Sequence, residues 1–307
     1  MPKNNSKLKI PTLDESVLAA LGFFNSNPPA LLKTSRFQFP LVIGSGNAYN
    51  TALVLFGQRP AIIADESNFK EITKNYNRAI KSKLIDQALI ISASGEKDSI
   101  WEIKLAKKIR LKTTLVTCSP DSPAAHLADN VINYQKLPEP YTYNTSTYLG
   151  MILGASQEKP AKIERSIKTL KLPRGFKAYQ AYSFLLPDKF QPLAEMIRIK
   201  KDELFGPHLS LRAFTKGEAR HAKFVHPWNK ELVISLGSNP YFGLKEHRWE
   251  IKTPRQIGPA FVMALTYYLI GLIQKSKEPY FKKHLAAFCA QGTKPYGQKK
   301  PFPIIVK

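Results

Sequence analysis

The chain has 307 residues, 43% of them hydrophobic, so it can form one large or two ordinary domains with buried cores and is not of the disordered class. No apolar run of about 18 residues occurs, and the basic, polar start MPKNNSKLKIPTLDES is not of signal-peptide type, so we expect a cytoplasmic protein with no membrane span. Cys118 and Cys289 lie in apolar surroundings and are expected to be ordinary buried thiols.

Lysine and arginine outnumber aspartate and glutamate by 46 to 23, which gives a net charge of +23. A positive field of this kind attracts the phosphates of nucleic acids without sequence preference. The basic residues are spread along the chain, however, and the sequence has no zinc-ligand spacing, basic zipper or RNA-binding aromatic motif. We therefore favour a basic surface that holds an anionic metabolite over a nucleic-acid-binding protein.

Strands and helices are expected to alternate through the first 160 residues. Helices are predicted in the segments NAYNTALVLFG and WEIKLAKKIR. Strands are predicted at 41–44, 61–65, 87–94, 113–119 and 128–134. Strands separated by helices indicate parallel crossovers, so the fold class is α/β with a doubly wound sheet. Ligands of such sheets bind at the carboxyl ends of the strands.

The charged segment 156–175 is poor in apolar residues and is expected to be a linker or a surface helix. We place a domain boundary there, which divides the chain into residues 1–160 and 161–307. Strands at 182–186 and 231–238 and helices at 192–204 and 259–274 are predicted in the second part.

The helix at 259–274 is strongly apolar and too short for a bilayer, so we expect it inside the protein or at a dimer interface. The C-terminal tail, residues 292–307, is rich in proline and lysine and is expected to wrap around the surface.

Residues 44–52, GSGNAYNTA, connect the first predicted strand to its helix. Glycines let backbone N–H groups approach an anion, and the helix dipole adds about half a positive charge at that point. The third glycine of a dinucleotide fingerprint is missing. A purely structural turn explains this loop equally well, so the loop is weak evidence by itself.

Residues 92–99, SASGEKDS, form a second loop between a strand and a helix. Its serines, its glycine and Lys97 bring hydroxyls, backbone amides and a cation to one helix N-terminus, which suits a phosphate monoester. The alternative is a helix N-cap with a polar first turn. The two loops together favour an anion site.

On these motifs the chain resembles the sugar isomerase (SIS) domain family. GSGNAYNTAL and IISASGEKDSIWEIKLAKK are similar to the small-residue loop and the S-x-S-G-E-T-type phosphate loop of that family. TTLVTCSPDSPAAHLADNVI resembles its next strand and loop, and PYTYNTSTYLG the Thr/Ser-rich start of the helix that closes the sugar pocket.

The resemblance extends over about residues 15–290. The segment with GEARH is similar, more loosely, to the second half of double-SIS isomerases. These include the bifunctional phosphoglucose/phosphomannose isomerases and the isomerase half of glucosamine-6-phosphate synthase.

The resemblance implies two SIS-type doubly wound domains, each with a parallel sheet flanked by helices. It implies a sugar-phosphate aldose–ketose isomerase, of the phosphoglucose/phosphomannose or amino-sugar phosphate isomerase/deaminase type, that needs neither cofactor nor metal. It also implies a homodimer with shared active sites. Substrate binding is assigned to Ser45, Gly46, Asn47, Ser92, Ser94, Gly95, Lys97, Ser99 and Thr145.

The same resemblance implies that Glu203 moves a proton between sugar C2 and C1 and that His221 opens the sugar ring in the neighbouring subunit's site. The 18 positions between them slightly exceed the family's spacing, so Asp202 and Glu218 are alternative bases. Ala48 stands where the family has a hydroxyl residue, and Lys97 where it has a threonine.

Aldose–ketose isomerisation needs a carboxylate base whose pKa is raised by partial desolvation. It also needs a positive charge beside the enediolate oxygen, which Lys200, Lys201 or Arg198 can supply. His208, His221 and His226 lack supporting Cys, Asp or Glu ligands, so no metal site is predicted. A non-catalytic SIS protein that binds or senses a sugar phosphate is the alternative function, favoured if Glu203 and His221 do not converge on the loops.

Overall fold

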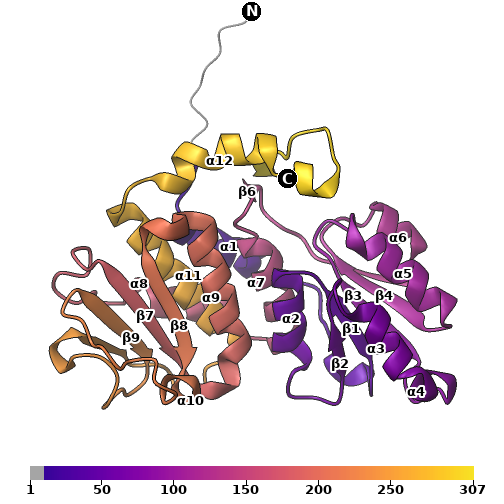
Figure 1. Ribbon diagram of the computed structural model, residues 1–307, viewed down its shortest axis with the longest axis horizontal. Helices are drawn as coiled ribbons and strands as arrows, with labels where there is room; N and C mark the ends of the chain where they lie inside the picture. The colour runs from indigo at the N-terminus through magenta and orange to yellow at the C-terminus, as the bar shows by residue number, and fades with distance from the viewer. Residues whose placement is uncertain (1–9) are drawn as a thin grey trace, which may run out of the picture.

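The computed structural model describes residues 10–307, so the first nine residues of the polar start lie outside the described part (Figure 1). Its first sheet has five strands, all parallel. In spatial order they are β2 (Ile62–Ala64), β1 (Leu41–Gly44), β3 (Gln87–Ile91), β4 (Lys112–Thr117) and β5 (Asn130–Asn133). All five predicted strands are confirmed, and so is the parallel α/β class. Because β2 lies on one side of β1 and β3 on the other, the winding reverses between β1 and β3.

The second sheet has four parallel strands. In spatial order they are β10 (Arg248–Ile251), β9 (Glu231–Leu236), β7 (Ala181–Leu186) and β8 (Ser210–Thr215). The predicted strands β7 and β9 are confirmed, and they are fully buried and mainly apolar. The edge strands β8 and β10 were not predicted, because half-exposed residues interrupt their apolar patterns.

A layer of helices fills the space between the two sheets (Figure 1). It consists of α1 (Leu13–Ser26), α2 (Asn47–Phe56), α7 (Thr145–Ser156), α9 (Gln191–Phe205) and α11 (Pro259–Ser276), and α8 (Pro160–Lys168) packs on α1 and α11. One hydrophobic core runs through this layer and reaches both sheets. Most residues of α11 are buried within the single chain, so this helix lies inside the protein and does not by itself call for a partner.

The outer faces of the two sheets are covered differently. On the first sheet lie α3 (Phe69–Asn75), α4 (Asn77–Lys81), α5 (Asp98–Lys108) and α6 (Pro123–Leu127). The second sheet has the short α10 (Lys216–Ala219) there, with Phe214, Phe224 and Phe242 packed around Leu185 and Val233.

The segment 156–175 contains α8, a surface helix that packs against α1 and α11 through buried Ile163 and Ile167. The domain boundary near residue 160 stays a prediction. Between residues 10 and 307, no helix is long and apolar enough to cross a membrane. Both cysteines are free thiols, Cys289 buried and Cys118 partly buried.

The C-terminal tail follows α12 (Tyr280–Gln291) back to the body of the protein. There β11 (Ile305–Val306) pairs antiparallel with β6 (Glu139–Pro140), which lies beside α12 at one end of the molecule (Figure 1). The predicted wrapping of the tail over the surface is confirmed.

Candidate functional site

The loops after β1 and β3 lie at the point where the winding of the first sheet reverses. Gly44 pairs with Ile91, so Ser45 and Ser92 begin their loops side by side. The chain then enters α2, which packs in the core between the sheets, and α5, which packs on the outer face. Parallel sheets bind ligands in the crevice that such a divergence opens at the carboxyl ends of the strands. The topology therefore brings the two predicted anion loops together.

The first loop turns at Gly46, whose φ of +57° favours glycine and which has no atom within 4 Å of an added Cβ. Ser45 is half-buried. The side chain of Asn47 is buried, and its Oδ1 has no hydrogen-bond partner among the described residues. A buried polar atom of this kind is costly unless a donor meets it, so Asn47 fits a hydroxyl or amine of a ligand.

The second loop is held tightly by its neighbours. Ser92 Oγ accepts from the backbone N–H of Gly95, 3.2 Å away, and the carbonyl of Ala93 accepts from the N–H of Cys118 at 3.0 Å. Gly95 has a φ of +60°, and an added Cβ would meet Ser122 Oγ at 1.9 Å. The hydroxyl of Ser94 stays exposed and is available to a ligand.

Two residues of this loop point elsewhere. Ser99 is buried and its hydroxyl donates to the carbonyl of Glu96 at 2.8 Å. The ammonium group of Lys97 lies over the rings of Tyr296 and Phe302 in the C-terminal tail, and burial lowers the pKa of Lys97. In this conformation the ligand-facing part of the loop is its backbone together with Ser92 and Ser94.

The N-terminus of α7 is capped by a carboxylate that sequence reasoning missed. Glu139 accepts from the N–H groups of Thr145 (2.7 Å) and Ser146 (2.6 Å) and from the Ser146 hydroxyl. Burial raises the pKa of Glu139, against the lowering effect of these hydrogen bonds. Thr145 is buried next to it, and its Oγ1 has no partner in the described part of the chain. No capping rule applied to the sequence reveals this role, because Glu139 precedes Thr145 by six residues and so lies outside the N-cap position.

Lys200 and Glu203 form an ion pair, 2.6 Å apart, on one face of α9. Lys200 is fully buried and also donates to the carbonyls of Thr142 and Tyr143. The Glu203 side chain is one-quarter exposed. Burial raises the pKa of Glu203, and the charge of Lys200 opposes this rise.

Tyr141 connects this ion pair to the second loop. Burial raises the pKa of its hydroxyl to about 12, and the charges of Glu203 and Glu96 add to the rise. The ring of Tyr141 stacks on Phe302, whose ring lies 4.6 Å from the ammonium group of Lys97, and the next residue, Thr142, accepts a hydrogen bond from Lys200. Glu203 lies near the C-terminal end of α9, a helix that contacts α12.

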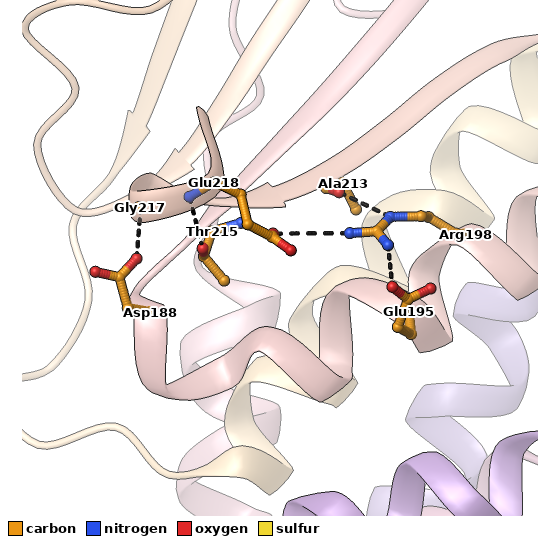
Figure 2. Close-up of polar contacts among 7 residues, drawn as sticks. All are labelled: Asp188, Glu195, Arg198, Ala213, Thr215, Gly217 and Glu218. Atoms are coloured by element: carbon orange, nitrogen blue, oxygen red, sulfur yellow. Dashed lines mark hydrogen bonds and ion pairs between the residues drawn. The ribbon is translucent and has the colours of Figure 1, made fainter. Parts of the chain in front are cut away.

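The two alternative bases, Asp202 and Glu218, interact with other residues. Asp202 is exposed and accepts from Lys201 at 2.7 Å. Glu218 forms a capping box with Thr215 at the start of α10 and lies 3.7 Å from the guanidinium of Arg198, as Figure 2 shows. A structural role thus accounts for Glu218, and of the three candidates Glu203 is the one beside Lys200.

His221 is exposed, away from Glu203. A cavity of about 450 Å³ next to it is lined by Arg198, Phe214, Glu218, His221 and Lys223. Arg198 precedes Glu203 by five residues on α9, which places the two side chains about 140° apart around the helix. Figure 1 shows α10 and α12 at opposite ends of the molecule. Within one chain, His221 and Glu203 do not form a single site.

Groups of three or more metal-binding side chains are absent from residues 10–307. The donors that face the ligand side of the loops are hydroxyls and backbone amides, which suit an anion. The backbone amides and hydroxyls of the loops have the chemistry to bind a phosphate, and Glu203 has the chemistry of a base.

No known family profile matches the sequence, and no curated protein sequence is similar to it. Among solved structures, the chain is similar to the C-terminal domain of glucosamine-fructose-6-phosphate aminotransferase from Francisella tularensis. This match has a TM-score of 0.56 and 12% identity, and covers 86% of this chain and 93% of that one.

It is also similar to tagatose-6-phosphate ketose/aldose isomerase from Escherichia coli (TM-score 0.56, 12% identity, 87% of this chain and 92% of that one). Glucosamine-6-phosphate deaminase from Thermotoga maritima matches with a TM-score of 0.55 and 15% identity, over 86% of this chain and 92% of that one. At these identities the likeness establishes the fold. The chain shares the α/β fold of these three proteins.

Proposed function

We propose that the protein is a sugar-phosphate aldose–ketose isomerase. The observation that carries this proposal is the Lys200–Glu203 ion pair. Lys200 donates to the carbonyl of Thr142, next to Tyr141, and Tyr141 stacks on Phe302, which contacts Lys97 of the second loop. The loops would bind the phosphate, so that binding energy far from the reacting carbons positions C1 and C2.

In the proposed reaction, Glu203 removes a proton from C1 of a ketose phosphate. The electron pair forms a C1–C2 double bond, and the carbonyl oxygen becomes the enediolate oxygen. A proton passes from O1 to O2, directly or through water, so the negative charge of the enediolate moves to O1. Glu203 then returns its proton to C2 while the C1–O1 bond becomes a carbonyl, which yields the aldose. A pKa raised by burial suits a carboxylate that must accept and release a proton near neutral pH.

Lys200 has three N–H donors and three acceptors, the carbonyls of Thr142 and Tyr143 and the carboxylate of Glu203. It would therefore act by holding Glu203 in place and by the field of its charge on the enediolate. We propose that His221 completes the site across a homodimer, since it lies far from Glu203 in its own chain.

The test is incubation with fructose 6-phosphate in deuterated water, with NMR detection of deuterium at C2 of the aldose product. Wild type should incorporate deuterium, and Glu203→Gln should lose turnover by about 10²- to 10⁴-fold with little change in affinity. Deuterium incorporation by both wild type and Glu203→Gln would assign the role of the base to Asp202 or Glu218. Exchange in neither would favour a protein that binds or senses a sugar phosphate.

Binding is measured separately by calorimetry. Ser94→Ala should weaken the affinity for fructose 6-phosphate by about 1–2 kcal/mol, the value of one hydroxyl hydrogen bond to a charged group. Ser166→Ala, on the surface of α8, is the control and should bind like wild type. Equal affinity of all three proteins would remove Ser94 from the site.

A further inference from the structure

The ammonium group of Lys97 is enclosed by the C-terminal tail. It lies 4.0 Å from the ring centroid of Tyr296 and 4.6 Å from that of Phe302. Among the contacts within residues 10–307, no hydrogen bond or ion pair of this ammonium group is present. The two aromatic faces are thus its partners, and they attract a cation through their ring quadrupoles.

The same part of the tail is joined to the segment before α7. The ring of Phe302 stacks on Tyr141 with centroids 4.4 Å apart, and the N–H of Tyr141 donates to the carbonyl of Ile304 at 2.9 Å. The pairing of β11 with β6 includes Glu139, which caps α7. The tail therefore bridges the loop at 92–99 and the segment that contacts Lys200.

Lys97 can serve either of two partners. Its backbone is the N-cap of α5 at the anion loop, and its flexible side chain ends between the tail's rings. The Tyr296 side of this contact is open to water, since Tyr296 is 54% exposed. A charge-assisted hydrogen bond to a phosphate is stronger than a partly exposed contact between an ammonium group and a ring.

We propose that Lys97 is a ligand-sensitive latch: it fastens the C-terminal tail over the loop at 92–99, and a phosphate bound in that loop draws the ammonium group away from Tyr296 and Phe302 and releases the tail. The inference rests on the proposed phosphate site. Release would loosen the hold of Phe302 on Tyr141, so occupancy of the loop is communicated to the segment that contacts Lys200.

The test is hydrogen exchange of the full-length protein, followed by mass spectrometry of peptides from residues 294–306. Lys97→Met keeps the length of the side chain and removes its charge. Lys104→Met is the matched control, because Lys104 is an exposed residue of the same helix. Without ligand, Lys97→Met should speed exchange in the tail by about threefold to tenfold, and Lys104→Met should leave it unchanged.

Saturating fructose 6-phosphate should speed exchange in the tail of wild type and of Lys104→Met but have no further effect on Lys97→Met. Slower exchange with ligand in wild type would overturn the latch, because the tail would then close on the ligand. Unchanged exchange in ligand-free Lys97→Met would overturn it as well.

Calorimetry with fructose 6-phosphate and with inorganic phosphate separates this inference from the proposed function. If neither fructose 6-phosphate nor inorganic phosphate binds, the proposed phosphate site is refuted, and so is the ligand-driven release of the tail. The ligand-free comparison of Lys97→Met with Lys104→Met still decides whether Lys97 fastens the tail. If inorganic phosphate alone releases the tail, the latch stands without the sugar assignment.

Discussion

Lys200 Nζ lies 2.6 Å from Glu203 Oε2, and the same nitrogen donates to the carbonyl of Thr142 at 2.6 Å and to that of Tyr143 at 2.9 Å. One fully buried cation thereby joins α9 to the segment that leads into α7. Glu203 is oriented by a partner that has no access to solvent, while its own side chain reaches the surface.

Lys200→Met should therefore destabilise the protein. The substitution leaves two carbonyls and a largely desolvated carboxylate without their donor, a loss of about 3–4 kcal/mol. Urea unfolding followed by circular dichroism measures the free energy of unfolding. Lys201→Met is the control. Lys201 pairs with Asp202, whose side chain is 69% exposed, so this substitution should change the free energy of unfolding by less than about 0.5 kcal/mol. Equal stability of the two variants would contradict the role assigned to Lys200.

Gly95→Ala tests the packing of the second loop. Its added Cβ would meet Ser122 Oγ at 1.9 Å, in addition to the strain of a positive φ. Gly46→Ala shares the positive φ but has open space around its Cβ. We expect a loss of about 1 kcal/mol for Gly46→Ala and about 2–4 kcal/mol for Gly95→Ala in thermal unfolding. Adding Ser122→Gly should recover part of the Gly95→Ala loss, and no recovery would show that the clash is not its cause.

Glu102 should make stability fall as pH rises. Burial raises its pKa to about 8, with Asp98, Glu66 and Asp65 adding to the rise. The unfolded chain releases this proton near pH 4.5, so the stabilising contribution is complete below that pH and is lost as pH rises toward 8. Glu102→Gln removes the titration, and its stability relative to wild type should increase by about 2–4 kcal/mol between pH 4.5 and pH 8.

The measurement is urea unfolding at a series of pH values, with the exposed Glu71→Gln as control. A difference between Glu102→Gln and wild type that stays constant with pH would show that the buried carboxyl does not titrate in this range.

Much of the fold could be predicted, because the central strands are continuous apolar runs. β1, β3, β7 and β9 are buried along nearly their whole length, and their sequences show it directly. The edge strand β8 was missed because the apolar Phe214 lies on its half-exposed face and the polar Thr215 on its buried face, so polarity does not alternate with burial. The helix α1 was missed because Asp14 and Ser16 are buried polar residues on its apolar face.

The site was predictable where it is local in sequence and not where it depends on distant contacts. The loops at 44–47 and 92–99 follow strands, so their places at the sheet edge could be predicted. The contact between Lys97 and Phe302 joins residues about two-thirds of the chain apart, and no spacing rule reveals it. The same holds for Glu139, whose role as a cap depends on how the chain turns before α7.

The last prediction concerns His221 and the homodimer. The side chain is exposed and lies beside Arg198, which points about 140° away from Glu203 around α9. If both residues act in one reaction, His221 must serve the site of a second copy, and a two-fold dimer provides two such shared sites. Light scattering should give twice the chain mass.

Mixed dimers separate the shared arrangement from a site within one chain. A Glu203→Gln chain and a His221→Ala chain, each inactive as a homodimer, are co-expressed with different tags and purified through both. If the sites are shared, one site of each mixed dimer combines intact Glu203 with intact His221, because they come from different chains. The isomerase activity should then recover to about half of the wild-type value per dimer, since one of two sites is intact. If both residues act within one chain, neither site is intact, and the mixed dimer should be as inactive as its parents.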